Sequence, residues 1–272
     1  MLRVGLVQTR TPASHAGALA HTEPLIREAA SAGATLIVTP ECSNILQRDR
    51  AKLFAQLEPL ESDPAVEGLR ALAAELSVWL LIGSALVRRD DGKAANRSVL
   101  VAPDGSVAAT YDKIHMFDVD LPTGERHRES SAYEAGDRAV VAQAAGAVLG
   151  LTICYDVRFP ALHAALARAG AQVITVPAAF TRPTGEAHWE TLLRARAIET
   201  GSFVLAAAQG GVHEDGRGTW GRSTVIAPWG EILAKADHDE PCVLVADLDL
   251  EAVTRARAAI PALENARAFA GP

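Results

Sequence analysis

Apolar residues in this chain recur with two spacings that alternate along its length. Short apolar runs, such as 35–39 and 148–153, are typical of strands buried in a sheet. Longer stretches place apolar residues three and four positions apart, as amphipathic helices do. The expected strands are 2–9, 35–39, 78–87, 96–102, 107–111, 148–153, 172–176, 202–208, 223–227, 232–236 and 243–247, and the expected helices are 15–32, 64–77, 161–169, 186–200 and 250–259.

Residues that favour turns and helix ends support these boundaries. Asp63-Pro64 predicts a capped helix start, and Pro103-Asp104-Gly105 predicts a hairpin turn. Pro24 is expected to kink or restart the first helix. Residues 114–137 are rich in charge, glycine and proline and show no sustained period, so a long functional loop is expected there.

The alternation of strands and helices, with hairpins between them, predicts an α/β layered fold with mixed sheets. No linker, repeat or low-complexity segment divides the sequence. Although 272 residues are many for one unit, α/β domains of this size exist. We therefore expect residues 1–272 to form a single domain.

The composition of the chain argues against several classes of function. The net charge is −7 and there is no long basic run, so neither nucleic acid nor an anionic membrane surface is an expected partner. No apolar run reaches a membrane-spanning length, and the first residues lack a signal-peptide pattern. Three cysteines are too few for a disulfide framework, and none has zinc-site spacing with histidine. These features predict a cytoplasmic protein without a metal.

Three side chains of possible chemical importance follow three of the predicted strands: Glu41, Lys113 and Cys154. Ligands of layered α/β folds bind where strands end. A carboxylate can take a thiol proton and an ammonium can stabilise an oxyanion, so the set suits acyl transfer. Nearby cations and a helix start would also favour the thiolate form of Cys154. Singly, Glu41 could cap a helix, Lys113 could be a surface charge and Cys154 a small buried apolar residue; the three matching positions favour catalysis.

The segments around these residues resemble the signatures of the nitrilase superfamily of carbon–nitrogen hydrolases. They are Pro40-Glu41, 111–118 (YDKIHMFD) and 153–160 (ICYDVRFP). The resemblance covers almost the whole chain and implies a four-layer αββα sandwich with two mixed β-sheets. It also implies a Glu41–Lys113–Cys154 triad, homodimers or higher homo-oligomers, and neither a metal nor an organic cofactor.

Further site residues are implied only by this resemblance. A second carboxylate on the loop after Lys113 matches Glu129, with Glu125 and Glu134 as alternatives on the same loop. Implied substrate contacts are the backbone N–H of Tyr155 and the side chains of Arg158, Phe180 and Thr184. Arg158 could instead form a structural ion pair, and Phe180 could belong to the core.

The segments 180–189 and 193–200 resemble amidases that act on small α-keto acid amides through a cysteine thioester. Segments 206–211 and 220–229 favour the branch that cleaves deaminated glutathione. The alternatives are an ω-amidase acting on α-ketoglutaramate or α-ketosuccinamate, and an N-carbamoyl amino acid hydrolase. A non-enzymatic metabolite-binding protein is disfavoured, because it would be expected to have lost a member of the triad.

Overall fold

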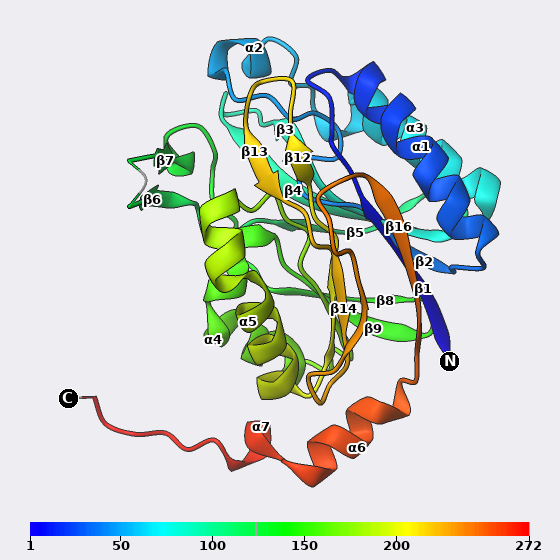
Figure 1. Ribbon diagram of the computed structural model, residues 1–272, viewed down its shortest axis with the longest axis vertical. Coiled ribbons are helices and arrows are strands. Elements are labelled where there is room, and N and C mark those ends of the chain that lie inside the picture. Colours follow the sequence, from blue (N-terminus) through cyan, green and yellow to red (C-terminus); the bar gives the residue numbers. More distant parts are fainter. Residues whose placement is uncertain (123, 272) are drawn as a thin grey trace.

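The computed structural model describes residues 1–122 and 124–271 (Figure 1). Sixteen strands are present in these ranges: β1 (Leu2–Gln8), β2 (Leu36–Val38), β3 (Trp79–Arg88), β4 (Ala94–Val101), β5 (Val107–Asp112), β6 (Asp118–Asp120), β7 (Arg126–Arg128), β8 (Val140–Ala144), β9 (Ala147–Leu151), β10 (Val173–Thr175), β11 (Phe203–Ala206), β12 (Gly210–Val212), β13 (Gly218–Trp220), β14 (Thr224–Ile226), β15 (Ile232–Lys235) and β16 (Cys242–Leu248). The α-helices are α1 (His15–Ser31), α2 (Arg50–Phe54), α3 (Pro64–Leu76), α4 (Pro160–Arg168), α5 (Arg182–Thr200), α6 (Glu251–Ala259) and α7 (Ala262–Asn265), and the 3₁₀ turns are η1 (Leu60–Ser62), η2 (Glu129–Ser131) and η3 (Cys154–Arg158).

Two six-stranded sheets form the centre of the molecule. One has the order β16-β1-β2-β3-β4-β5 and the other the order β15-β14-β11-β10-β9-β8. The central strands β1, β2 and β3 run parallel, as do β9, β10 and β11, whereas the outer strands pair antiparallel. Both sheets are therefore mixed, as the sequence predicted. Parallel neighbours also bring the carboxyl ends of consecutive strands to one edge, where the site is found.

Helices cover the outer face of each sheet. Figure 1 shows α1 and α3 beside the first sheet and α4 and α5 beside the second. Strand β2 illustrates why the sequence favours this arrangement: Leu36 and Val38 point into the core shared with the second sheet, whereas Ile37 packs in the cluster with α1 and α3. A strand that is buried on both faces appears in the sequence as a continuous run of apolar residues. The predicted four-layer αββα sandwich is confirmed.

Local differences from the predicted elements have simple causes. The prediction of a loop at 114–137 is wrong in part, because it contains the β6–β7 hairpin and η2. These strands have three residues each, too few to show a period. The prediction that Pro24 restarts the first helix is also wrong: α1 continues through it. Pro24 lies on the exposed face, where water can satisfy the carbonyl that loses its helical donor.

Several short elements were not predicted at all: α2, β8, β12 and β13. Helix α5 begins at Arg182, four residues before its predicted start, because Pro183 fits the first turn of a helix. Within the described residues, no helix combines the length and apolar character needed to cross a membrane.

Candidate active site

Glu41 is placed by a close approach between two strands. It follows β2 after Thr39 and Pro40, and its side chain is nearly completely buried. Strand β3 bulges at Gly83, where an added Cβ would lie 1.9 Å from the Thr39 carbonyl oxygen. Only glycine allows the backbone of β3 to come this near. The amide of the next residue, Ser84, then donates to the Pro40 carbonyl at 3.1 Å and holds the turn that presents Glu41.

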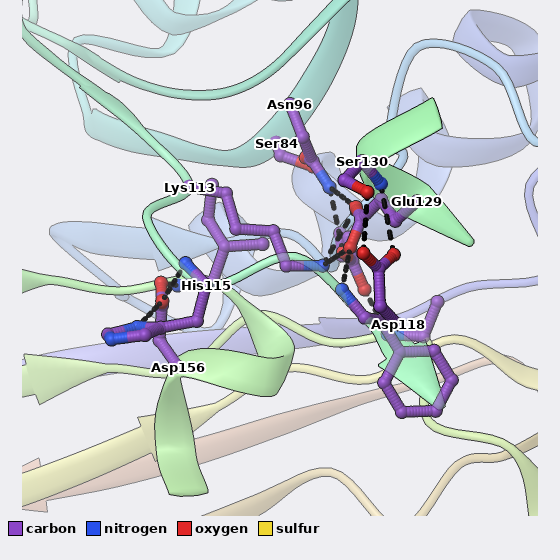
Figure 2. A network of polar contacts seen from close by, with 12 residues as sticks. Ser84, Asn96, Lys113, His115, Asp118, Glu129, Ser130 and Asp156 are labelled. Atoms are coloured by element: carbon purple, nitrogen blue, oxygen red, sulfur yellow. Dashed lines mark hydrogen bonds and ion pairs between the residues drawn. The ribbon is translucent and has the colours of Figure 1, made fainter. Parts of the chain in front are cut away.

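Lys113 and Asn96 come from neighbouring antiparallel strands. Lys113 directly follows β5, and its backbone N–H donates to the Asn96 carbonyl at 2.9 Å. The Asn96 amide donates to Glu41 Oε1 at 2.8 Å and to Glu129 Oε1 at 3.3 Å. Lys113 Nζ donates to the same Glu41 oxygen at 3.1 Å and to both Glu129 oxygens at 2.9 and 2.8 Å. One amide and one ammonium therefore join the two carboxylates (Figure 2).

Cys154 stands on a sharp turn between a strand and a helix, as predicted. Strand β9 ends at Leu151, and Cys154 opens η3, which leads into α4. Its φ of 51° lies in the left-handed region, which a non-glycine residue adopts only when the surroundings impose it. The Cys154 N–H is anchored to the Pro177 carbonyl at 2.8 Å. The next N–H, that of Tyr155, donates to no backbone carbonyl of the described residues, so it is free to face a ligand.

A buried carboxylate ties the Lys113 segment to the Cys154 segment. Asp156 Oδ1 accepts from the backbone and ring nitrogens of His115 at 3.1 and 2.7 Å, and Oδ2 accepts from the Tyr111 hydroxyl at 2.7 Å and from the Ile153 N–H at 2.9 Å. Figure 2 shows His115 turned toward Asp156 while Lys113 extends toward Glu129. Asp156 therefore fixes the relative position of two chain segments that come from different sheets.

The charges at this site control one another. Burial alone would raise the pKa of Glu41, but the Lys113 charge and hydrogen bonds bring it below its usual value. Burial alone would lower the pKa of Lys113, but Glu129 and Glu41 raise it well above its usual value. The carboxylate and the ammonium are consequently both ionised at neutral pH.

The pKa of the Cys154 thiol differs from what the sequence led us to expect. Burial and the negative charge of Glu41 raise its pKa well above the usual value, and the opposing effect of Lys113 is smaller. Lys113 favours the thiolate, as predicted, but burial and Glu41 outweigh it, so the resting group is the thiol. A buried thiol beside an ionised carboxylate needs that carboxylate to take its proton when it reacts.

The loop offers three glutamates, and each has a different partner in the structure. Glu129 binds Lys113 and also accepts from the Phe117 N–H at 2.6 Å. Glu134 pairs with Lys93 on the surface, and Glu125 lies 3.7 Å from His127, about half exposed. Of the three, Glu129 is the one that contacts Lys113.

A cavity of about 480 Å³ opens from these groups to the surface. Its walls include Tyr155, Phe180 and Thr184, three of the four predicted substrate contacts. Arg158 is not among the described residues that line it. Its guanidinium lies 5.8 Å from the centre of the Tyr155 ring and 5.5 Å from that of Phe180, so its predicted contact with substrate remains a prediction.

Some residues of the cavity were missed from the sequence. Asn96 binds both carboxylates, and the polar residues Asn96, Arg97 and Ser98 inside strand β4 were the signal that could have revealed it. Other missed residues carry cationic or aromatic side chains: Arg48, Arg50, Phe54, Phe117, Arg126, His127, Arg128, Tyr133 and Arg217. They lie on loops, on the short strand β7 and on the five-residue helix α2, which are too short to show a periodic pattern. The described residues contain no group of three or more metal-ligating side chains suited to an ion.

Comparison with known proteins places this chain in a family. The carbon–nitrogen hydrolase family model matches residues 3–258. The chain therefore belongs to the carbon–nitrogen hydrolase family, and the resemblance to the nitrilase superfamily is confirmed.

Two relatives and one solved structure show how similar this chain is to individual proteins. Deaminated glutathione amidase of Yersinia enterocolitica is 39% identical over 252 residues, covering 92% of this chain and 87% of that protein. Omega-amidase NIT2 of Homo sapiens is 35% identical over 265 residues, covering 97% of this chain and 95% of that protein. The crystal structure of the C. elegans NitFhit protein matches with a TM-score of 0.88 and 31% identity, over 98% of this chain and 65% of that chain.

Proposed function

We propose that this protein is an amidase that cleaves a carbon–nitrogen bond through a thioester on Cys154. The observation that carries the proposal is the buried cluster of Glu41, Lys113 and Cys154 at the inner end of the cavity. It combines a nucleophile, a carboxylate ready to accept its proton and a fixed positive charge.

The first half-reaction forms the thioester. Glu41 takes the proton of the Cys154 thiol while the sulfur attacks the amide carbonyl carbon. The developing oxyanion is stabilised by Lys113 Nζ and by the backbone N–H of Tyr155. Glu41 then gives the proton to the leaving nitrogen, and the carbon–nitrogen bond breaks.

The second half-reaction regenerates the enzyme. Water attacks the thioester carbonyl while Glu41 takes a proton from it, and the carbon–sulfur bond breaks. Glu41 returns the proton to the sulfur of Cys154. The sum is one amide and one water converted to one acid and one amine, without a metal or organic cofactor. Glu129 holds Lys113 charged and directs it at the oxyanion.

For the substrate we propose an α-keto acid amide, with deaminated glutathione as the first candidate. The relative that bears this activity in its name is 39% identical over most of both chains, and the cavity of about 480 Å³ has room for a dipeptide leaving group. Tyr155, Arg158, Phe180 and Thr184 are the proposed substrate contacts. The second candidate is an ω-amidase, because the human relative of that name covers 97% of this chain.

The deciding experiment measures kcat/KM in parallel for deaminated glutathione, α-ketoglutaramate and an N-carbamoyl amino acid, with intact-protein mass spectrometry after rapid quenching. We expect the highest value for deaminated glutathione and an acyl adduct that maps to Cys154. A higher value for α-ketoglutaramate would make the protein an ω-amidase. Turnover of none of the amides, without an adduct, would contradict the proposed function.

We further propose that the single domain of residues 1–272 acts in the cytoplasm as a homodimer or higher oligomer. An apolar surface formed by Ile198 on α5 and by Trp229, Ile232 and Leu233 in the adjacent hairpin supports self-association. The cysteines Cys42, Cys154 and Cys242 are all unpaired, as suits a reducing compartment. Light scattering measures the molar mass in solution of Trp229→Glu and of the unmodified protein. If the substitution leaves this mass unchanged, the apolar surface is not the interface between copies.

A further inference from the structure

The cavity gathers positive charge in a protein that is negative overall. The chain has a net charge of −7, yet six of its 26 lysine and arginine residues line this one cavity, against three carboxylates, which are Glu41, Glu125 and Glu129. The six are Arg48, Arg50, Lys113, Arg126, Arg128 and Arg217. Such an excess of cations around one opening attracts and orients anionic ligands.

Three of these six cations already have close carboxylate partners. Lys113 is neutralised by Glu41 and Glu129. Arg128 binds Asp120 at 2.8 Å, and Arg126 lies 3.4 Å from the same carboxylate. These three side chains hold the site and its hairpin together, so they are poor candidates for binding a further anion.

Of the other three cations, Arg50 lies with its guanidinium 5.4 Å from the centre of the Phe54 ring, and Arg48 and Arg217 remain largely free. Arg48 is exposed and forms no ion pair within residues 1–122 and 124–271. Arg217 approaches Asp215 only at 3.9 Å, beyond hydrogen-bond distance. Both line the cavity with His127, whose pKa is lowered mainly by burial; Glu125 opposes this effect, and the charges of Arg217 and Arg48 add to it. The two guanidinium groups therefore act on one ring in the cavity wall, although they come from segments 169 positions apart.

His127 adds an independent observation. Its Nε2 atom is buried and has no hydrogen-bond partner among the described residues. A buried polar atom without a partner costs stability unless a ligand or water satisfies it. The nearest carboxylate, that of Glu125, is 3.7 Å from this atom, so the cavity lined by Arg48 and Arg217 also holds a ring nitrogen without a hydrogen bond.

We infer that Arg48 and Arg217 form a carboxylate-binding subsite in the outer part of the cavity, which selects amides whose leaving group ends in a carboxylate. Guanidinium groups bind carboxylates through paired, charge-assisted hydrogen bonds. The leaving group is assigned to this part for a mechanistic reason: it must reach solvent while the acyl group is still bound to Cys154. This inference rests on the proposed amidase function and adds the residues that choose the leaving group.

The test compares two substrates that differ in one group. They are deaminated glutathione and its analogue in which the terminal glycine carboxylate is a carboxamide. We expect the unmodified protein to prefer the carboxylate in kcat/KM by about 10- to 100-fold, the range for a hydrogen bond to a charged group. Arg48→Gln and Arg217→Gln should each lower this ratio, and the double variant should bring it near one. Arg89→Gln, which removes an exposed arginine paired with Asp91, is the charge-matched control and should keep the ratio.

A binding experiment separates this inference from the proposed chemistry. Calorimetry with Cys154→Ala measures the affinity for the same two compounds, with and without Arg48→Gln or Arg217→Gln. A carboxylate preference that both arginine substitutions reduce supports the subsite, even if the active protein turns over neither compound, in which case only the proposed function fails. Equal affinity for the two compounds, binding of neither, or a preference that survives both substitutions would overturn the subsite.

Discussion

The cations at the two ends of the cavity differ in how closely they are paired with carboxylates. At the inner end, Lys113 is 2% exposed and meets carboxylate oxygens of Glu41 and Glu129 at 2.8 to 3.1 Å. At the outer end, Arg48 is exposed and Arg217 touches one carboxylate only at 3.9 Å. A charge removed from water must be paired to be tolerated, whereas an exposed one can stay free. The inner end is consequently preorganised for one reaction, and the outer end keeps unused donors for a ligand.

This difference has consequences for mutation. Removing one partner of a buried ion pair costs about 3–5 kcal/mol, whereas an exposed pair contributes about 0–1 kcal/mol. Changes to the paired charges at the inner end should therefore affect both the reaction and the stability of the fold, and changes at the outer end should affect substrate choice alone.

The largest effect is expected for Cys154→Ala. Without the nucleophile, kcat should fall by at least about 10⁴-fold, while the free energy of unfolding should stay within about 1 kcal/mol because only one sulfur atom is removed. Cys242→Ala, on β16 and far from the reacting groups in the sequence, is the matched control and should keep turnover. Steady-state kinetics and denaturant titration measure the two quantities. Amidase activity near that of the unmodified protein in Cys154→Ala would refute a covalent mechanism.

Lys113→Arg should be next in severity. The planar guanidinium keeps the charge, but it is too large for a site that is 2% exposed and cannot stand where a compact ammonium meets the oxyanion. We expect kcat to fall by about 10²–10³-fold, as for loss of an oxyanion donor. Lys93→Arg, an exposed lysine paired with Glu134, supplies the control. A kcat close to normal would mean that only the positive charge of residue 113 matters, and not the position of its hydrogen-bond donors.

Glu129→Gln should have an intermediate effect. The amide keeps an acceptor for Lys113 but loses the charge, so Lys113 is held less firmly. The expected results are a kcat lower by about 10- to 100-fold and a free energy of unfolding lower by about 1–3 kcal/mol. Glu125→Gln, on the same loop but about half exposed, should change neither. If Glu125→Gln and Glu129→Gln had equal effects, the assignment of the supporting carboxylate would fail.

The smallest effect is expected from moderate acid. The pKa of Glu41 lies below the usual value for a glutamate, and the pKa of the Cys154 thiol lies well above the usual value for a cysteine. Near neutral pH, Glu41 is therefore ionised and Cys154 is protonated, as the proposed reaction requires. The profile of kcat/KM should therefore stay flat from about pH 8 to about pH 5 and decline only as Glu41 is protonated. An acid limb centred near pH 6.5 would instead indicate a histidine in the reaction.

Much of the inner end could be predicted from the sequence because its residues lie at ends of regular elements. Glu41, Lys113 and Cys154 each follow an apolar run, and parallel strands bring such ends together. Asn96 was overlooked because its role depends on the antiparallel register that sets β4 beside β5. The outer end was not predicted, because Arg48 and Arg217 lie in segments without a hydrophobic period.

By itself, the sequence determined the layered fold and pointed to the three groups that we propose as reactive. Hydrophobic periodicity and turn residues act over a few positions, and the segments around these groups are continuous in the chain. Only the tertiary structure decided the protonation of the Cys154 thiol, the choice of Glu129 over Glu125 and Glu134, and the presence of Arg48 and Arg217 in one cavity. Each of these depends on burial and on distances between groups remote in sequence, which set pKa values and pairing through solvation and Coulomb energy.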